Sequence, residues 1–353
     1  MTRIRKRGEQ VREFILETVE SSSEKVVALT TEKFGISRQA VHRHLRHLID
    51  QGTLVHSKNG VYNLCPQQRW EETFSLADNP YEDVVWRNEI KKRLGQLPDN
   101  ALSIWHYGFT EMFNNVVDHS ESKTGVIGIV KTAYSIEMDI CDFGVGIFNK
   151  IMKATNLLDE RHAVIELTKG KLTTDPEKHT GEGIFFTSRM FDEFNILSGE
   201  VFLSHRYGKD EDWMLQNQKP SVGTFITMKL RNNTSRTTKQ ILDQFTSGDD
   251  IGFTKTVVPV RMAQYGDEKL VSRSQAKRLL ERIDRFKTVL FDFRGVETIG
   301  QAFADEVFRV SVNEHPHVSF IPINTNDTVM QVINNIRYNT NNNQTSLPNT
   351  QTS

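Results

Sequence analysis

The spacing of hydrophobic positions predicts a compact unit at the start of the chain. Apolar residues recur at helical intervals over residues 8–22, and a second, shorter helix follows to about residue 34. A third helix is expected over 37–51, where the apolar residues form one stripe. The segment TLVHSKNGVYNL then predicts a β-hairpin that turns at its Asn-Gly pair. This order of elements is typical of a winged helix-turn-helix over residues 1–65.

A longer unit with mixed periods is predicted over residues 81–232, after a connector at 66–80. Its first part has the period of a helix, and its later parts contain segments that alternate as strands do. Residues 157–180 are polar, carry three lysines, and are expected to form a mobile loop. The expected elements are a helical stretch at 81–119 broken near Leu97-Pro98, strands at 125–131 and 135–142, a helix that opens at Gly181, and strands near 195–206 and 222–230.

The last third of the chain predicts a small α/β unit over residues 251–337, reached through a polar linker at 233–250. Strands and helices alternate in it, with one helix expected at 273–286. The tail at 338–353 is polar and low in complexity, and we expect it to be disordered. The fold class expected for the chain is therefore a multidomain α/β protein.

Composition supports folded units and shows where charge is concentrated. Of the 353 residues, 37% are hydrophobic and 25% are charged, which is enough apolar material for packed cores. The net charge is −1, so the whole chain indicates no general affinity for nucleic acid. The first 63 residues nevertheless hold 11 Lys and Arg against 7 Asp and Glu, and the difference of 11 and 7 is a surplus of +4.

The cysteines and the apolar runs indicate a protein of a reducing compartment. Cys65 and Cys141 lie far apart in sequence, so neither a disulfide framework nor a cysteine metal site is expected. The basic start is not followed by the apolar region of a signal peptide, and no run reaches the roughly 20 apolar residues that span a bilayer. We therefore expect a cytoplasmic protein without a membrane partner.

The helix that ends at residue 119 carries a polar stripe beside its hydrophobic one. Glu111, Asn115 and Asp118 fall on one arc of the helix, and His119 lies between that arc and the hydrophobic stripe. Two carboxylates and an amide stacked in this way could hold a hydrated divalent cation and a water molecule. A polar stripe is also what any solvated helix face shows, so this pattern alone leaves both interpretations open.

Glycines then recur beside polar residues at two further places. Asp142 directly follows a strand and precedes Gly144 and Gly146, where a carboxylate can accept a hydrogen bond from an exocyclic amine and the glycines let a flat ring approach the backbone. The same short pattern could also be a tight turn. The segment 180–183, Thr-Gly-Glu-Gly, opens a helix whose free N–H groups favour phosphate. A last glycine, at the start of the closing strand, precedes Thr224.

In this order the motifs resemble the ATP-binding domain of the GHKL superfamily, which includes gyrase-type ATPases, histidine kinases and anti-sigma-factor serine kinases. The polar helix stripe resembles the N box of that superfamily, and the three later segments resemble its glycine boxes. The resemblance covers about residues 80–232. A P-loop is excluded, because no G-x-x-x-x-G-K-[ST] occurs.

The resemblance implies ATP and Mg²⁺ as cofactors and assigns a role to each motif. It implies that Asn115 binds Mg²⁺, that Glu111 positions or activates the attacking group, and that Asp142 recognises the adenine amine. The remaining residues that it implies for nucleotide binding are Asp118, His119, Gly144, Gly146, Thr180, Gly181, Gly183 and Thr224.

The N-terminal unit is expected to bind double-stranded DNA through its third helix. Polar and basic side chains lie off the apolar stripe of that helix, where they could reach base edges and phosphates in the major groove. The wing tip adds a further lysine. The candidate DNA-binding residues are Arg38, Gln39, His42, Arg43, Arg46 and Lys58. A winged helix used only for protein contacts is the alternative.

The C-terminal unit resembles the STAS domain of anti-sigma-factor antagonists. The resemblance rests on the segment VLFDFRGV at 289–296, followed by Ile299 and a helix. The phosphoacceptor serine of that family aligns with Ala302, so a phosphorylation switch at this position is not expected. A plain interaction or dimerisation module is the favoured interpretation of this unit.

Two functions agree with these features. The first is an ATP-dependent transcriptional regulator, in which nucleotide binding or hydrolysis controls the binding of DNA and of partners. The second is a serine/threonine kinase of the anti-sigma type that acts on a STAS-like domain, with a STAS-like or sigma-factor-like regulatory protein as its partner. A homodimer is compatible with both. A repair or topology ATPase is disfavoured because no transducer domain follows the central unit, and a sensor histidine kinase because no paired-helix phosphoacceptor segment precedes it.

Overall fold

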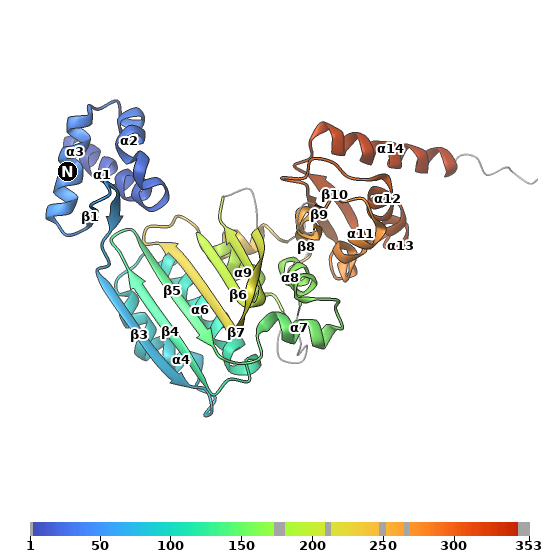
Figure 1. The fold of residues 1–353 in the computed structure, drawn as a ribbon, viewed down its shortest axis with the longest axis horizontal. Coiled ribbons are helices and arrows are strands. Elements are labelled where there is room, and N and C mark those ends of the chain that lie inside the picture. Colours follow the sequence, from blue (N-terminus) through green and yellow to red (C-terminus); the bar gives the residue numbers. More distant parts are fainter. Residues whose placement is uncertain (1–2, 173–180, 209–212, 247–251, 265–267, 345–353) are drawn as a thin grey trace, which may run out of the picture.

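The computed structural model describes residues 3–172, 181–208, 213–246, 252–264 and 268–344, and Figure 1 shows a helical N-terminal unit, a central sheet and a C-terminal unit in succession. Thr180, one of the residues implied for nucleotide binding, lies outside the described residues. The chain is a mixed α/β protein of several units, as its hydrophobic pattern predicts.

The N-terminal unit consists of three helices and a two-stranded antiparallel hairpin. Ser37 caps the third helix, because its hydroxyl accepts a hydrogen bond of 3.2 Å from the N–H of Ala40. The apolar stripes of the helices meet in a core of their own, which includes Ile15, Val41 and Leu45. The elements are α1 (Arg3–Ser22), a 3₁₀ turn (Ser23–Lys25), α2 (Val26–Phe34), α3 (Arg38–Asp50), β1 (Leu54–His56) and β2 (Tyr62–Leu64).

The central unit is a five-stranded antiparallel sheet in the order β3-β4-β5-β7-β6, with helices packed against it (Figure 1). The strands are β3 (Gln68–Ser75), β4 (Thr124–Lys131), β5 (Ser135–Asp142), β6 (Glu193–Arg206) and β7 (Trp213–Arg231). The helices are α4 (Glu82–Val85), a π turn (Trp86–Ile90), α5 (Lys91–Leu94), α6 (Asp99–His119), α7 (Ile147–Thr155), α8 (Glu160–Lys169) and α9 (Gly183–Met190).

The C-terminal unit has a three-stranded parallel sheet in the order β10-β9-β8, with helices between the strands. Its strands are β8 (Lys255–Pro259), β9 (Thr288–Asp292) and β10 (Ser319–Ile323). Its helical elements are a 3₁₀ turn (Val260–Ala263), α11 (Arg273–Leu280), a 3₁₀ turn (Ile283–Arg285), α12 (Gln301–Asp305), a π turn (Glu306–Val310), α13 (Ser311–Glu314) and α14 (Asp327–Gln344).

Two segments expected to lack regular structure are elements of the central unit. The connector expected at 66–80 contains β3, which pairs along its whole length with β4 and forms the edge of the sheet. The loop expected at 157–180 contains α8, whose residues from His162 onward are buried although half of them are polar or charged. This helix lies between the central sheet and the C-terminal unit, so contacts with both keep its polar groups from water.

Three further boundaries differ from those expected. The linker at 233–250 contains α10 (Thr238–Asp243), because Ile241 on it is buried. The helix expected at 273–286 ends at Leu280, and its last residues form a 3₁₀ turn instead. The tail expected to be disordered from residue 338 continues α14 to Gln344, and residues 345–353 lie outside the described part.

The central and C-terminal units share one continuous hydrophobic core, whereas the N-terminal core is separate. Phe253 from the C-terminal unit packs against Phe185 of α9, with their ring centroids 4.5 Å apart. The N-terminal unit contacts the sheet through polar groups: Glu20 of α1 lies 2.5 Å from the Lys229 ammonium and accepts a 2.9 Å hydrogen bond from the hydroxyl of Ser135.

In the described ranges, no helix combines the length and the apolar character that crossing a bilayer would need.

Candidate functional site

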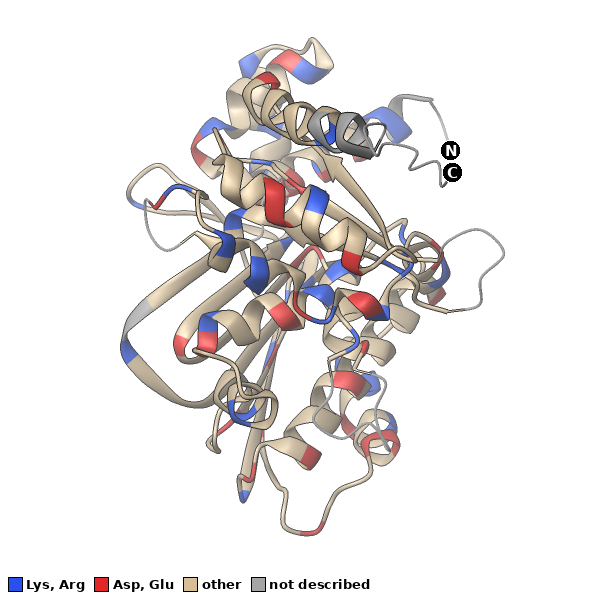
Figure 2. Cartoon of the chain, turned by 90° about the vertical axis from the view of Figure 1, so that its right-hand side faces the viewer, with Lys and Arg blue, Asp and Glu red and all other residues tan. Residues whose placement is uncertain are grey.

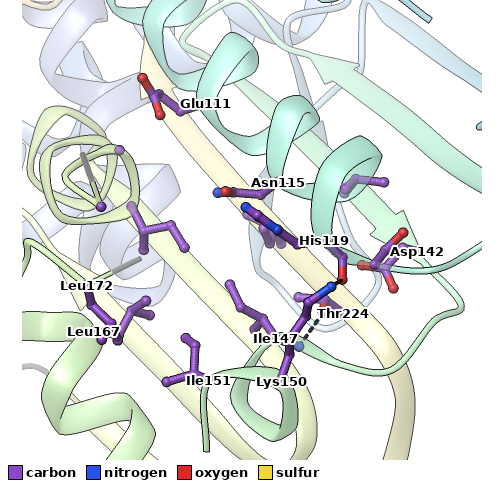
Figure 3. A pocket seen from close by; sticks show the side chains of 16 residues that line it. Glu111, Asn115, His119, Asp142, Ile147, Lys150, Ile151, Leu167, Leu172 and Thr224 are labelled. Carbon is purple, nitrogen blue, oxygen red and sulfur yellow. Dashed lines mark hydrogen bonds between the residues drawn. The ribbon is translucent and has the colours of Figure 1, made fainter. Parts of the chain in front are cut away.

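A cavity of about 240 Å³ lies between α6, the end of β5, α7 and the start of α9 (Figure 3). Its walls come from segments that are far apart in sequence. The lining residues are Glu111, Asn115, Val116, His119, Ser120, Asp142, Ile147, Lys150, Ile151, Leu167, Leu172, Gly181, Gly183, Ile184, Thr224 and Ile226. Seven of the residues singled out in the sequence therefore line one cavity.

Helix α6 supplies one polar wall. Glu111, Asn115 and His119 recur every four residues and face the cavity, while Phe109 and Met112 on the other side of the helix are buried in the core. Asp118, which was expected to share the arc of Glu111 and Asn115, is exposed and does not line the cavity, whereas His119 does. Its position, one residue before His119, turns it about 100° away from that residue.

Asp142 forms the polar end of the cavity at the carboxyl end of β5. Its side chain is 4% exposed, and Oδ1 accepts a 2.9 Å hydrogen bond from the N–H of Gly144. Burial raises the pKa of Asp142, while hydrogen bonds from Gly144 and Thr224 oppose that shift. The hydroxyl of Thr224 in turn accepts a 3.0 Å hydrogen bond from the N–H of Ile147, so it ties β7 to the start of α7. A buried carboxylate at the wall of a cavity can accept a further hydrogen bond from a donor group.

Gly144 and Gly146 do not line the cavity but allow the turn beside it to close. A Cβ on Gly144 would overlap the carbonyl of Ser120, and the N–H of the next residue donates a 2.9 Å hydrogen bond to that same carbonyl. Gly146 has a φ of 79°, and a Cβ there would lie 2.7 Å from the hydroxyl of Ser198. These glycines thus place Asp142 and α7 rather than form a wall.

The second glycine turn lies at the start of α9, and its Gly181 and Gly183 line the cavity. Gly181 has a φ of 72°, and its carbonyl accepts a 3.2 Å hydrogen bond from the N–H of Leu172. Glu182, the N-cap residue of α9, makes no side-chain capping hydrogen bond to the first turn, whose N–H groups are the kind that can bind an anion. Burial raises the pKa of Glu182, and the ammonium of Lys171 opposes that rise.

The sequence interpretation missed Lys150 and the apolar residues of this cavity. Lys150 lies on α7, and its ammonium donates hydrogen bonds of 2.8 Å to the carbonyl of His119 and 3.1 Å to Oε1 of Glu121. Ile147 and Ile151 on the same helix add an apolar wall. The spacing of these three residues, four or fewer apart, was the available signal for a helix face beside the glycine turn.

The candidate DNA-binding residues lie together on the N-terminal unit. Arg38, Gln39, His42, Arg43 and Arg46 are all exposed on α3, opposite its buried stripe, and Lys58 is exposed at the turn of the hairpin. Ala302, which aligns with the family phosphoacceptor, is exposed in the first turn of α12.

Comparison with known families assigns part of the C-terminal unit. Comparison with curated proteins finds no match. Residues 275–330, which extend from α11 to the start of α14, match the family model of a STAS-like domain of unknown function (DUF4325). The chain thus contains a STAS-like domain in its C-terminal unit, as the segment around β9 suggested.

Proposed function

We propose that the protein is an ATP-binding transcriptional regulator, in which Mg·ATP in the central cavity controls the binding of DNA and of partner proteins. One observation carries this proposal: residues from four separate sequence motifs, each of which resembles a GHKL motif, line the same cavity. Four short motifs have no reason to meet in one cavity if each is an ordinary turn or a solvated helix face.

The adenine is expected to bind at the Asp142 end. Asp142 is a buried carboxylate, which accepts hydrogen bonds only, and the adenine amine is a donor. Ile147, Ile151 and Ile226 supply apolar surface for the faces of the ring. A guanine would present a carbonyl oxygen in place of the amine, so the same carboxylate would disfavour GTP.

The phosphates are expected between α6 and the start of α9. The cavity there is bordered by Gly181 and Gly183, whose lack of side chains leaves backbone N–H groups accessible. The amide oxygen of Asn115 can supply one ligand to Mg²⁺, which otherwise keeps water and phosphate oxygens. Glu111 faces the same region and is the carboxylate that could orient or deprotonate an attacking water or hydroxyl.

Both neighbouring units contact the central unit close to elements that line the cavity. Leu167 and Leu172 line the cavity, and Lys169 between them donates a 2.7 Å hydrogen bond to the carbonyl of Glu281 in the STAS-like domain. On the other side, Glu20 of α1 contacts Lys229 of β7, the strand that also carries Thr224. Nucleotide binding that shifts these elements would therefore act on both neighbours.

The proposal is tested by titrating the full chain with Mg·ATP in a calorimeter and repeating the titration with Asp142→Asn. The amide would present a donor to the adenine amine, so affinity should fall by roughly ten- to a hundredfold, the loss typical of a charge-assisted hydrogen bond. The exposed Asp118→Asn variant makes the same chemical change outside the cavity and should bind as wild type does. No binding to wild type, or equal binding by Asp142→Asn, would contradict the nucleotide site.

A protein serine/threonine kinase is the second candidate. The STAS-like domain at residues 275–330 favours it, because domains of this type are the substrates implied by the resemblance to anti-sigma-factor kinases. Incubation with γ-labelled ATP separates the two functions. Label on protein would support the kinase, whereas free phosphate or unchanged ATP would support the regulator.

A further inference from the structure

A second cavity, of about 280 Å³, lies between the central unit and the STAS-like domain. Its floor includes Pro259 and Asp292, which end the parallel strands β8 and β9. The carboxyl ends of parallel strands are the edge at which open α/β sheets commonly bind ligands. The residues that line it are Arg189, His205, Arg206, Tyr207, Gly208, Ile241, Gln244, Phe245, Val257, Pro259, Arg261, Asp292 and Arg294.

The lining of this cavity is strongly basic. Among the described residues, four arginines (Arg189, Arg206, Arg261 and Arg294) and one histidine contribute to it, against the single carboxylate of Asp292. In the view of Figure 2, by contrast, Lys and Arg are interspersed with Asp and Glu along the chain. The arginines come from α9, β6, the turn after β8 and the turn after β9, so the fold and not one local sequence run brings them together.

Two of the guanidinium groups are fixed by hydrogen bonds. Asp292 is 5% exposed; its Oδ2 accepts a 2.7 Å hydrogen bond from Nε of Arg294, and its Oδ1 accepts one of 3.0 Å from Asn324. Arg189 donates to the carbonyl of Phe185 at 3.1 Å, and its guanidinium lies 3.7 Å from the centroid of the Phe185 ring. These bonds hold Arg189 and Arg294 beside the cavity, where their positive charge favours phosphate or carboxylate groups.

An aromatic wall completes the cavity. Tyr207 is 42% exposed, and the guanidinium of Arg236 covers one face of its ring at 3.9 Å from the centroid. Phe245 and Ile241 add apolar surface. The cavity therefore offers a cationic end and an apolar side, which is the lining expected for a small organic anion rather than for a bare ion.

We propose that this cavity binds a small organic molecule with at least two negative charges, carried by phosphate or carboxylate groups. The site is distinct from the nucleotide cavity, because none of the residues that the structure describes lines both. The ligand would contact Arg206 of the central unit and Arg261 of the C-terminal unit together, and so it would strengthen the junction between them.

The test is calorimetric titration of the full chain with pyrophosphate and, separately, with citrate. The test variant is Arg206→Gln/Arg261→Gln, because both side chains are exposed and neither is needed for the core. The control is Arg69→Gln/Arg87→Gln, which removes the same charge from exposed positions on other elements. Circular dichroism before each titration checks that both variants are folded.

We expect wild type and the control pair to bind at least one of the two anions at millimolar concentration or better. The Arg206→Gln/Arg261→Gln variant should lose at least about tenfold in affinity, as the removal of charge-assisted hydrogen bonds predicts. Binding of pyrophosphate alone would assign the site to a phosphate ester, and binding of citrate alone to a polycarboxylate. The proposal is overturned if wild type binds neither anion, or if the two double variants lose affinity equally.

Discussion

A Cβ atom on Gly183 would overlap Oε2 of Glu111, so the start of α9 lies directly against the carboxylate of α6. Nothing in the backbone of Gly183 itself requires glycine, because its φ is not in the left-handed region. The close approach to Glu111 is therefore the reason that we infer for a glycine here. Because of this contact, the distance between α6 and α9 determines the direction in which the Glu111 carboxylate points.

Gly183→Ala should change activity more than stability. The new methyl group meets the far end of a flexible side chain, so Glu111 can rotate away at little cost to folding. If Glu111 orients the attacking group, phosphate release or transfer should fall by about ten- to a hundredfold, while the melting temperature stays close to that of wild type. Phosphate release and calorimetric melting on the same preparation measure both.

Gly181→Ala serves as the contrast. Its φ of 72° is strained for any residue with a side chain, and a Cβ there would overlap the backbone of Leu172. This variant should lose both stability and nucleotide affinity. If Gly183→Ala destabilises the chain as much as Gly181→Ala does, the close approach at Glu111 is structural and not functional.

Lys169→Met should destabilise the junction between the central unit and the STAS-like domain. Lys169 is 1% exposed and pairs with Glu166, which is 2% exposed, so the variant leaves a buried carboxylate with Arg282 at 3.8 Å as its remaining described partner. Breaking one half of a buried ion pair typically costs about 3–5 kcal/mol. Guanidinium unfolding measures the loss, and Lys153→Met on the exposed side of α7 is the control.

The double variant Glu166→Met/Lys169→Met distinguishes the ion pair from the shape of the site. Replacement of both charges by apolar groups is often neutral, so this variant should be more stable than Lys169→Met. If the two variants unfold at the same denaturant concentration, the buried carboxylate is not the cause of the loss.

The junction should also weaken in acid through His162. Burial, the largest cause, lowers the pKa of His162 below its ordinary value of 6.5, although Glu281, Glu166 and Asp159 oppose this shift and Lys169 adds to it. The unfolded chain then binds the proton more readily than the folded chain. The contribution of His162 to stability is therefore complete above pH 6.5 and is lost as pH falls below that value.

The measurement is the denaturation midpoint between about pH 7.5 and pH 5.5, where each unit of pKa difference is worth about 1.4 kcal/mol. The variant His162→Gln cannot titrate, so its midpoint should fall less over this range than that of wild type. His317→Gln, at an exposed position, should retain the full dependence. A wild-type slope that His162→Gln leaves unchanged would assign the effect to another group.

The sequence was most informative where the backbone itself imposes a requirement. The residues around Asp142 and Gly181 could be found because a buried carboxylate at a strand end and a left-handed turn each need particular residue types. The hairpin between β1 and β2 was predictable for the same reason, since Gly60 has a φ of 80°.

Elements whose burial depends on other units were missed. Helix α8 appears polar in isolation, and its buried Glu166 and Lys169 are explained only by the STAS-like domain packed on them. Strand β3 has one partner strand and mostly exposed side chains, so it lacks the hydrophobic alternation of a central strand. Lys150 was missed because its role depends on where α7 lies, which the local sequence does not state.

The exposed face of α3 is expected to contact DNA. If Arg38 and Arg43 contact bases, replacing either by Ala should cost roughly 1–3 kcal/mol on the specific site and relax its sequence preference. If they contact phosphates only, binding should weaken on all sequences alike and the salt dependence should become shallower.

The experiment first selects the specific DNA site from genomic fragments. The affinity of the protein is then measured on that site and on unrelated DNA at several salt concentrations. Lys25→Ala, an exposed basic position outside α3, is the control for charge. Equal specific binding by the Arg38→Ala/Arg43→Ala double variant and by wild type would exclude α3 as the recognition helix, and the N-terminal unit would then be a module for protein contacts.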